Sequence, residues 1–128
     1  MQWQKNMLLI DANVILRGIL NDHPEMTQKA KEVMQTGAYT KPEVIAEVVY
    51  VLQKVYSVQR PQIKDLLNRV LPIVRCSEEK CVLSALDLYA QISLDFVDCL
   101  LVAYHSLNGE AVFSFDKKLN KYLSTDTV

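Results

Sequence analysis

Short apolar runs alternate along this chain with longer segments whose apolar residues recur at helical spacing. The first run covers residues 7–10 and the last clear one covers residues 111–114. Between them, segments such as residues 44–55 and 63–71 place an apolar residue every three or four positions. This alternation predicts an α/β domain with helices flanking a small parallel sheet.

Local signals place the individual elements. Strands are expected at about residues 7–10, 37–40, 72–76 and 111–114, and helices at about 13–20, 25–35, 42–55, 60–71, 77–91, 95–107 and 116–123. Thr40 has the spacing of a capping box with Glu43, and Ser77 is placed to cap the helix that follows it. Residues 1–128 are expected to form one domain, because no repeat or change in composition divides them.

The composition describes a compact, helix-rich protein. Half of the residues are hydrophobic and only three are glycine. No apolar stretch approaches the roughly 20 residues of a membrane span, and the first residues do not resemble a signal peptide. A soluble cytoplasmic protein without membrane partners is therefore expected. Cys76, Cys81 and Cys99 form no metal-binding pattern and are expected to be buried, reduced thiols.

An aspartate follows shortly after each of two expected strands. Asp11 follows the first apolar run, and Asp116 follows shortly after the last. Ligands of parallel α/β sheets collect at the carboxyl ends of the strands, so the two carboxylates suggest a divalent-cation site. Either residue could instead cap the helix that begins beside it.

Three further acids are candidate ligands. Glu47 lies at or beside the apolar face of its expected helix, where a carboxylate is costly without a cation or a hydrogen-bond partner. A position at the helix edge, beside a basic residue, is its alternative. Asp95 and Asp98 share one side of a first helical turn, where they could also act as caps. Asp98 is the better ligand candidate, with Asp95 as an auxiliary.

The charge distribution permits a polyanionic substrate although the net charge is −1. Setting these five acids aside leaves 14 basic against 10 acidic side chains, a balance of +4. Lys117, Lys118 and Lys121 follow Asp116 closely and could line the same groove, or they could form an ordinary solvated helix face. Carboxylate clusters suit Mg²⁺ or Mn²⁺, which can activate water for attack on a phosphodiester.

Four segments together resemble the PIN-domain family of metal-dependent ribonucleases, particularly the VapC-type toxins of toxin–antitoxin pairs. The segments are residues 9–17, 43–52, 94–103 and 112–119. They occur in the family's order and cover nearly the whole chain. The resemblance implies a PIN-like three-layer fold with a parallel sheet of four or five strands.

The resemblance also implies roles for individual residues. The acidic metal-site residues would be Asp11, Glu47, Asp98 and Asp116, with Asp95 a frequent addition. Asn13 and Ser114 match polar positions near the site, and Arg17 matches a frequent arginine that could reach a phosphate. The expected activity is Mg²⁺-dependent hydrolysis of RNA by metal-activated water.

The family further implies a homodimer and a small antitoxin protein that blocks the site. Possible interface residues are Trp3, Val51, Val55 and Tyr56, most of which could equally belong to the core. The principal competing interpretation is a catalytically inactive module that binds RNA or a protein. A phosphoacceptor receiver and a haloacid dehalogenase fit less well, because Asp11 lacks the second acid that each requires.

Overall fold

The computed structural model describes residues 7–123 as seven helices around a small parallel sheet. The strands are β1 (Leu8–Leu9), β2 (Ala38–Thr40) and β3 (Arg75–Cys76), and the helices are α1 (Ala12–Leu20), α2 (Pro24–Gln35), α3 (Pro42–Lys54), α4 (Arg60–Val70), α5 (Glu79–Gln91), α6 (Phe96–Asn108) and α7 (Lys117–Asn120). The predicted α/β class with a parallel sheet and flanking helices is confirmed. Every predicted helix forms, and most begin and end within two residues of the expected position.

The sheet has the order β1-β2-β3, and both pairings are parallel. In register, Leu8 lies opposite Ala38 and Tyr39 lies opposite Arg75. The described residues thus contain three strands rather than the four or five expected. Residues 111–114 form no strand, because no strand within residues 7–123 lies beside them.

Two expected helix caps are also wrong. Thr40 is the last residue of β2 and is fully buried, so Lys41 occupies the N-cap of α3 without a side-chain hydrogen bond. Ser77 precedes the cap of α5, which is Glu78 in a left-handed conformation with a φ of 53°. In both cases the N-cap lies one residue later than the capping pattern suggested.

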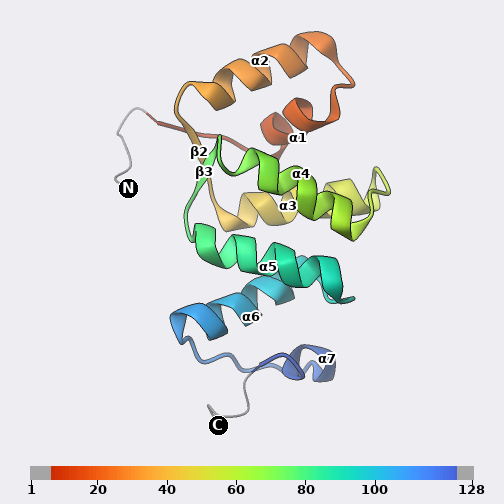
Figure 1. The fold of residues 1–128 in the computed structure, drawn as a ribbon, viewed down its shortest axis with the longest axis vertical. Helices are drawn as coiled ribbons and strands as arrows, with labels where there is room; N and C mark the ends of the chain where they lie inside the picture. The colour runs from red at the N-terminus through yellow and green to blue at the C-terminus, as the bar shows by residue number, and fades with distance from the viewer. Residues whose placement is uncertain (1–6, 124–128) are drawn as a thin grey trace.

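The helices pack in pairs along the longest axis of the molecule. Figure 1 shows the α1–α2 pair at the top, α3 and α4 in the middle, α5 and α6 below them, and α7 at the bottom. The closest helix pairs are α5 with α6, α1 with α2, and α4 with α5. One continuous hydrophobic core extends from Ile10 and Ile15 to Leu119. No helix within residues 7–123 is long and apolar enough to span a membrane.

Candidate active site

Three of the predicted acids gather at the N-terminal end of α6. Asp95 is the N-cap residue, Asp98 lies in the first turn, and Asp116 approaches from the N-cap of α7. Burial raises the pKa of the Asp98 carboxyl, and the charges of Asp95 and Asp116 raise it further. The Asp98 carboxyl holds its proton more strongly because its ionisation would place a third negative charge beside those of Asp95 and Asp116, at a partly buried position. We call these three residues the α6 acid group.

Asp116 is held in place by its own backbone surroundings. One carboxylate oxygen accepts hydrogen bonds from the N–H groups of Lys118 (2.8 Å) and Leu119 (3.3 Å). Its own N–H donates to the Ser114 hydroxyl at 2.9 Å. Ser114 therefore orients the aspartate through the backbone, and Asp116 does cap a helix, as the alternative interpretation expected.

The other two predicted ligands do not join the α6 acid group. Asp11 lies at the N-cap of α1, where its carboxylate accepts from the Val14 N–H at 3.1 Å. Glu47 is exposed on α3, which agrees with the helix-edge alternative rather than with a place on the apolar face. The buried side of α3 carries Ile45, Val48 and Val49. Glu47 projects from the remaining face.

The described residues accordingly hold no group of three or more acids, histidines or cysteines close enough to bind one metal ion. The donor chemistry of the α6 acid group fits a hard divalent cation, since all its ligands are carboxylate oxygens. The arrangement within residues 7–123 does not, because no three of these acids lie close enough together to share one ion.

A groove of about 310 Å³ runs from the α6 acid group along α3. Its walls include Tyr50 and Lys54 on α3, Tyr89 on α5, and Asp95 and Asp98. Tyr50 is 61% exposed. An exposed aromatic ring beside a cation and a set of carboxylates can accept a nucleobase, because every base can stack on such a ring. The sequence analysis missed Tyr50 and Lys54, although both share a helix with Glu47.

Arg60 is a second residue that the sequence analysis missed. Its Nη1 donates to the carbonyl oxygens of Tyr89 (3.1 Å), Ile92 (2.9 Å) and Leu94 (2.8 Å). Its guanidinium carbon lies 4.1 Å from the centroid of the Tyr89 ring. Arg60 thus fastens the turn that leads from α5 into Asp95. An Arg-Pro pair at a helix start gives no signal of such a role.

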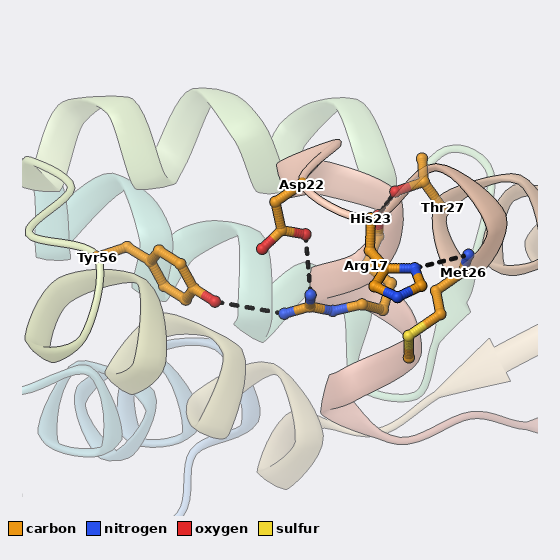
Figure 2. A network of polar contacts seen from close by, with 6 residues as sticks. All are labelled: Arg17, Asp22, His23, Met26, Thr27 and Tyr56. Carbon is orange, nitrogen blue, oxygen red and sulfur yellow. Dashed lines mark hydrogen bonds and ion pairs between the residues drawn. The ribbon is translucent and has the colours of Figure 1, made fainter.

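Arg17 does not point toward the α6 acid group. Figure 2 shows its guanidinium between Asp22 and Tyr56, with contacts of 2.8 Å and 3.3 Å respectively. The hydrogen bond to Tyr56 and the charge of Asp22 raise the pKa of Arg17. Burial has the opposite effect, but the pKa is raised overall. The Arg17 side chain thus connects α1 with the loop after α3. Its expected contact with a phosphate would require the bonds to Asp22 and Tyr56 to break. Asn13 is exposed next to Asp11.

The lysines after Asp116 differ in their contacts. Lys118 donates from Nζ to the Ser93 hydroxyl at 2.8 Å, which ties α7 to the α5–α6 turn. Lys117 and Lys121 are exposed. Residues Val51, Val55 and Tyr56 are partly or largely exposed, whereas Trp3 lies outside the described residues. All three cysteines are free and buried, as expected.

Comparison with protein families identifies the domain to which the chain belongs. The model of the PIN domain matches residues 8–122. Comparison with curated proteins and with solved structures gave no match. The PIN domain is a nuclease-type fold, and its extent here includes β1, the α6 acid group and α7. Because the match covers nearly all of the sequence, the chain belongs to the PIN domain family.

Proposed function

We propose that this protein is a divalent-metal-dependent endoribonuclease that hydrolyses RNA phosphodiesters. The observation that carries the proposal is the position of Asp95 and Asp98 in the groove along α3, with Asp116 near enough to raise the pKa of Asp98. Carboxylates with perturbed pKa values beside a groove are more common at functional sites than elsewhere. Membership of the PIN family supports a nuclease rather than a structural role.

Asp98 and Asp116 are proposed as cation ligands, with Asp95 as an auxiliary acid. Asp11 and Glu47 complete the proposed set. Bound Mg²⁺ or Mn²⁺ would supply an activated water and neutralise charge on the phosphate. The chain itself orients Asp116 through the Ser114 hydroxyl and places Asp95 through the Arg60 contacts with the α5–α6 turn.

The groove beside these acids is the proposed path of the RNA. Tyr50 would stack on one base, and Lys54 would pair with a phosphate one helical turn further along α3. Lys118 extends the basic surface on the other side of Asp116. Lys117 and Lys121 are exposed next to it and would add phosphate contacts.

The test is cleavage of a fluorescently labelled single-stranded RNA with and without added Mg²⁺ or Mn²⁺. The wild-type protein should cut only with the cation, and Asp98→Asn should lose almost all activity while its circular dichroism spectrum stays unchanged. Asp65→Asn is the matched control, because it makes the same chemical change at an exposed position on α4. Equal cleavage by the wild type and Asp98→Asn would refute the proposal.

A finer proposal concerns biological role. As a VapC-like toxin, the protein would act in the cytoplasm and be inhibited by a small antitoxin protein that covers the acids and the groove. Co-purification of a small inhibitory protein, whose removal releases ribonuclease activity, would support this role. RNA binding without cleavage, over a range of RNAs and metal ions, would instead favour an inactive binding module.

A further inference from the structure

A second groove, separate from the α6 acid group, is lined by α1, α2 and α4. Its volume is about 370 Å³, and it shares no lining residue with the groove along α3. Figure 1 shows the three helices above α5, on the side of the molecule opposite α7. Within residues 7–123, α2 packs closely on α1 but not on α4. The space between α2 and α4 therefore stays open, and we call it the α2–α4 groove.

The lining of the α2–α4 groove is mostly apolar. It includes Gly18 on α1, Met34 on α2, and Leu66 on α4. A side chain at Gly18 would overlap the terminal methyl group of Met34, so glycine lets this methyl group lie against α1. Ile73, in the turn after α4, also lines the groove and is 52% exposed. An apolar ligand in the groove would remove this surface from water, which is favourable.

Two basic side chains line the same groove from different helices. Lys31 belongs to α2 and Arg69 to α4, and both are exposed. Lys31 donates to the neutral side-chain oxygen of Asn21 at 3.5 Å. Within residues 7–123, the Arg69 side chain makes no hydrogen bond or ion pair, and no acidic residue lines the groove. The groove therefore combines apolar walls with positive charge that no acid in its lining neutralises.

The dimensions of the α2–α4 groove favour a small molecule. Its volume lies within the range of about 300–1,000 Å³ that is usual for ligand sites. Its walls take in residues 31–35 of α2 and 66–70 of α4, each about 6 Å long, whereas a protein helix of three turns would need about 16 Å. Among the described residues, none that lines the groove is aromatic, so it offers no ring on which a nucleobase could stack.

We propose that the α2–α4 groove binds a small organic anion with an apolar body, of the class of medium-chain carboxylates. Arg69 would hold the carboxylate, because guanidinium groups pair with carboxylates through two parallel hydrogen bonds. Lys31 would add positive charge from α2, and the hydrocarbon chain would cover Met34, Leu66 and Ile73. The site is independent of the proposed nuclease function, because it contains neither the acids nor any residue of the groove along α3.

Titration of the whole protein with octanoate in a calorimeter tests the charge and the chain separately. Octanoate should bind at one saturable site. Acetate lacks the hydrocarbon chain and octylammonium reverses the charge, so each should bind about ten times more weakly or not at all. The backbone amide resonances that shift on addition of octanoate should belong mainly to residues 18–19, 31–35 and 66–73.

Matched variants assign the binding to individual basic side chains. Arg69→Gln should weaken octanoate binding about tenfold, because it removes a charged hydrogen-bond donor. Lys31→Gln should weaken binding about threefold, as expected for an exposed ion pair. Lys29→Gln is the matched control, because Lys29 is also an exposed lysine on α2 but does not line the groove, and its affinity for octanoate should equal that of the wild type.

Gly18→Ala tests the apolar part of the site without a change of charge. The added methyl group would push the flexible end of Met34 toward the groove that it lines, so octanoate should bind about ten times more weakly. Circular dichroism checks that this variant folds. If it does not, Ile73→Glu at the exposed position after α4 takes its place, since a carboxylate there would repel octanoate and weaken binding by a similar factor.

Three results would overturn the proposed site. The first is an absence of saturable octanoate binding, including the case in which an acidic helical peptide binds in its place, which would assign the groove to a protein partner. The second is octanoate binding that Arg69→Gln and the folded apolar variant both leave unchanged, because the ligand would then lie elsewhere. The third is binding of octylammonium as tight as that of octanoate, because positive charge in the groove would then play no part.

Discussion

Replacement of Arg60 by methionine should loosen the turn that positions Asp95. Arg60 contacts three carbonyl oxygens from one nitrogen, Nη1. This nitrogen carries two hydrogens, so the three contacts amount to about two full hydrogen bonds, one of them shared. A bond from a charged donor contributes about 1.5–3 kcal/mol, and the stacking on Tyr89 about 1 kcal/mol. Methionine preserves the apolar stem.

Water can reach part of this site, because Arg60 is only partly buried. Water molecules would satisfy some of the released carbonyl groups, so the expected loss is about 2–4 kcal/mol in the free energy of unfolding. Urea denaturation measures the loss directly. Arg69→Met is the matched control, because Arg69 is an exposed arginine on the same helix. Its change should stay within about 0.5 kcal/mol.

The Arg60 substitution should also affect the acids. A looser turn lets Asp95 and Asp98 move, so ribonuclease activity should fall by more than the fraction of protein that unfolds. A loss of stability no larger than that of the Arg69 control would refute the argument that Arg60 fastens the turn. If the variant loses the expected amount of stability but its folded fraction keeps normal activity, the turn holds its position without the arginine.

Three further predictions follow from pKa values and charges. In the absence of metal at neutral pH, Asp98→Asn should raise the melting temperature, because the folded-state pKa of Asp98 is raised and its ionised form destabilises the fold. The gain should disappear as the pH falls through that pKa. A lower melting temperature of the variant at neutral pH would contradict this. Lys118→Ala should reduce the slope of the logarithm of the RNA association constant against the logarithm of salt concentration by about 0.7. Lys29→Ala, at an exposed position on α2, should leave the slope unchanged. Fluorescence anisotropy of labelled RNA measures both slopes. Burial raises the pKa of Cys76 and Cys99 to about 12, so neither should react with a thiol reagent before unfolding, and rapid labelling of the native protein would refute their burial.

Local patterns predicted the helices because helical periodicity is a property of neighbouring residues. Residues 63, 67 and 70 are apolar at helical spacing and are buried on α4. The predicted strands were less accurate, since a strand exists only where another strand pairs with it. Residues 72–74 show this well, because the β3 pairing begins only at Arg75.

The sequence indicated which acidic residues to consider, but not where all of their side chains lie in the fold. Local signals predicted that Asp95, Asp98 and Asp116 lie at the starts of α6 and α7. The approach of Asp116 to Asp98 depends on how α7 packs near α6, which those signals do not contain. The exposure of Glu47 depends on how α3 is rotated about its axis, which one or two residues of apolar pattern do not define. The contacts of Arg60 depend on the approach of residues 29 to 34 positions away, and no local pattern carries that information.

The separation of Asp11 from Asp98 follows from the same dependence on partners. Each aspartate follows a strand or a strand-like segment, so its final position is determined by the neighbour with which that segment pairs. β1 has one such neighbour, and residues 111–115 have none within the described chain. The strand-end pattern therefore predicted the two aspartates but not their separation, because it contains no information about which strands pair.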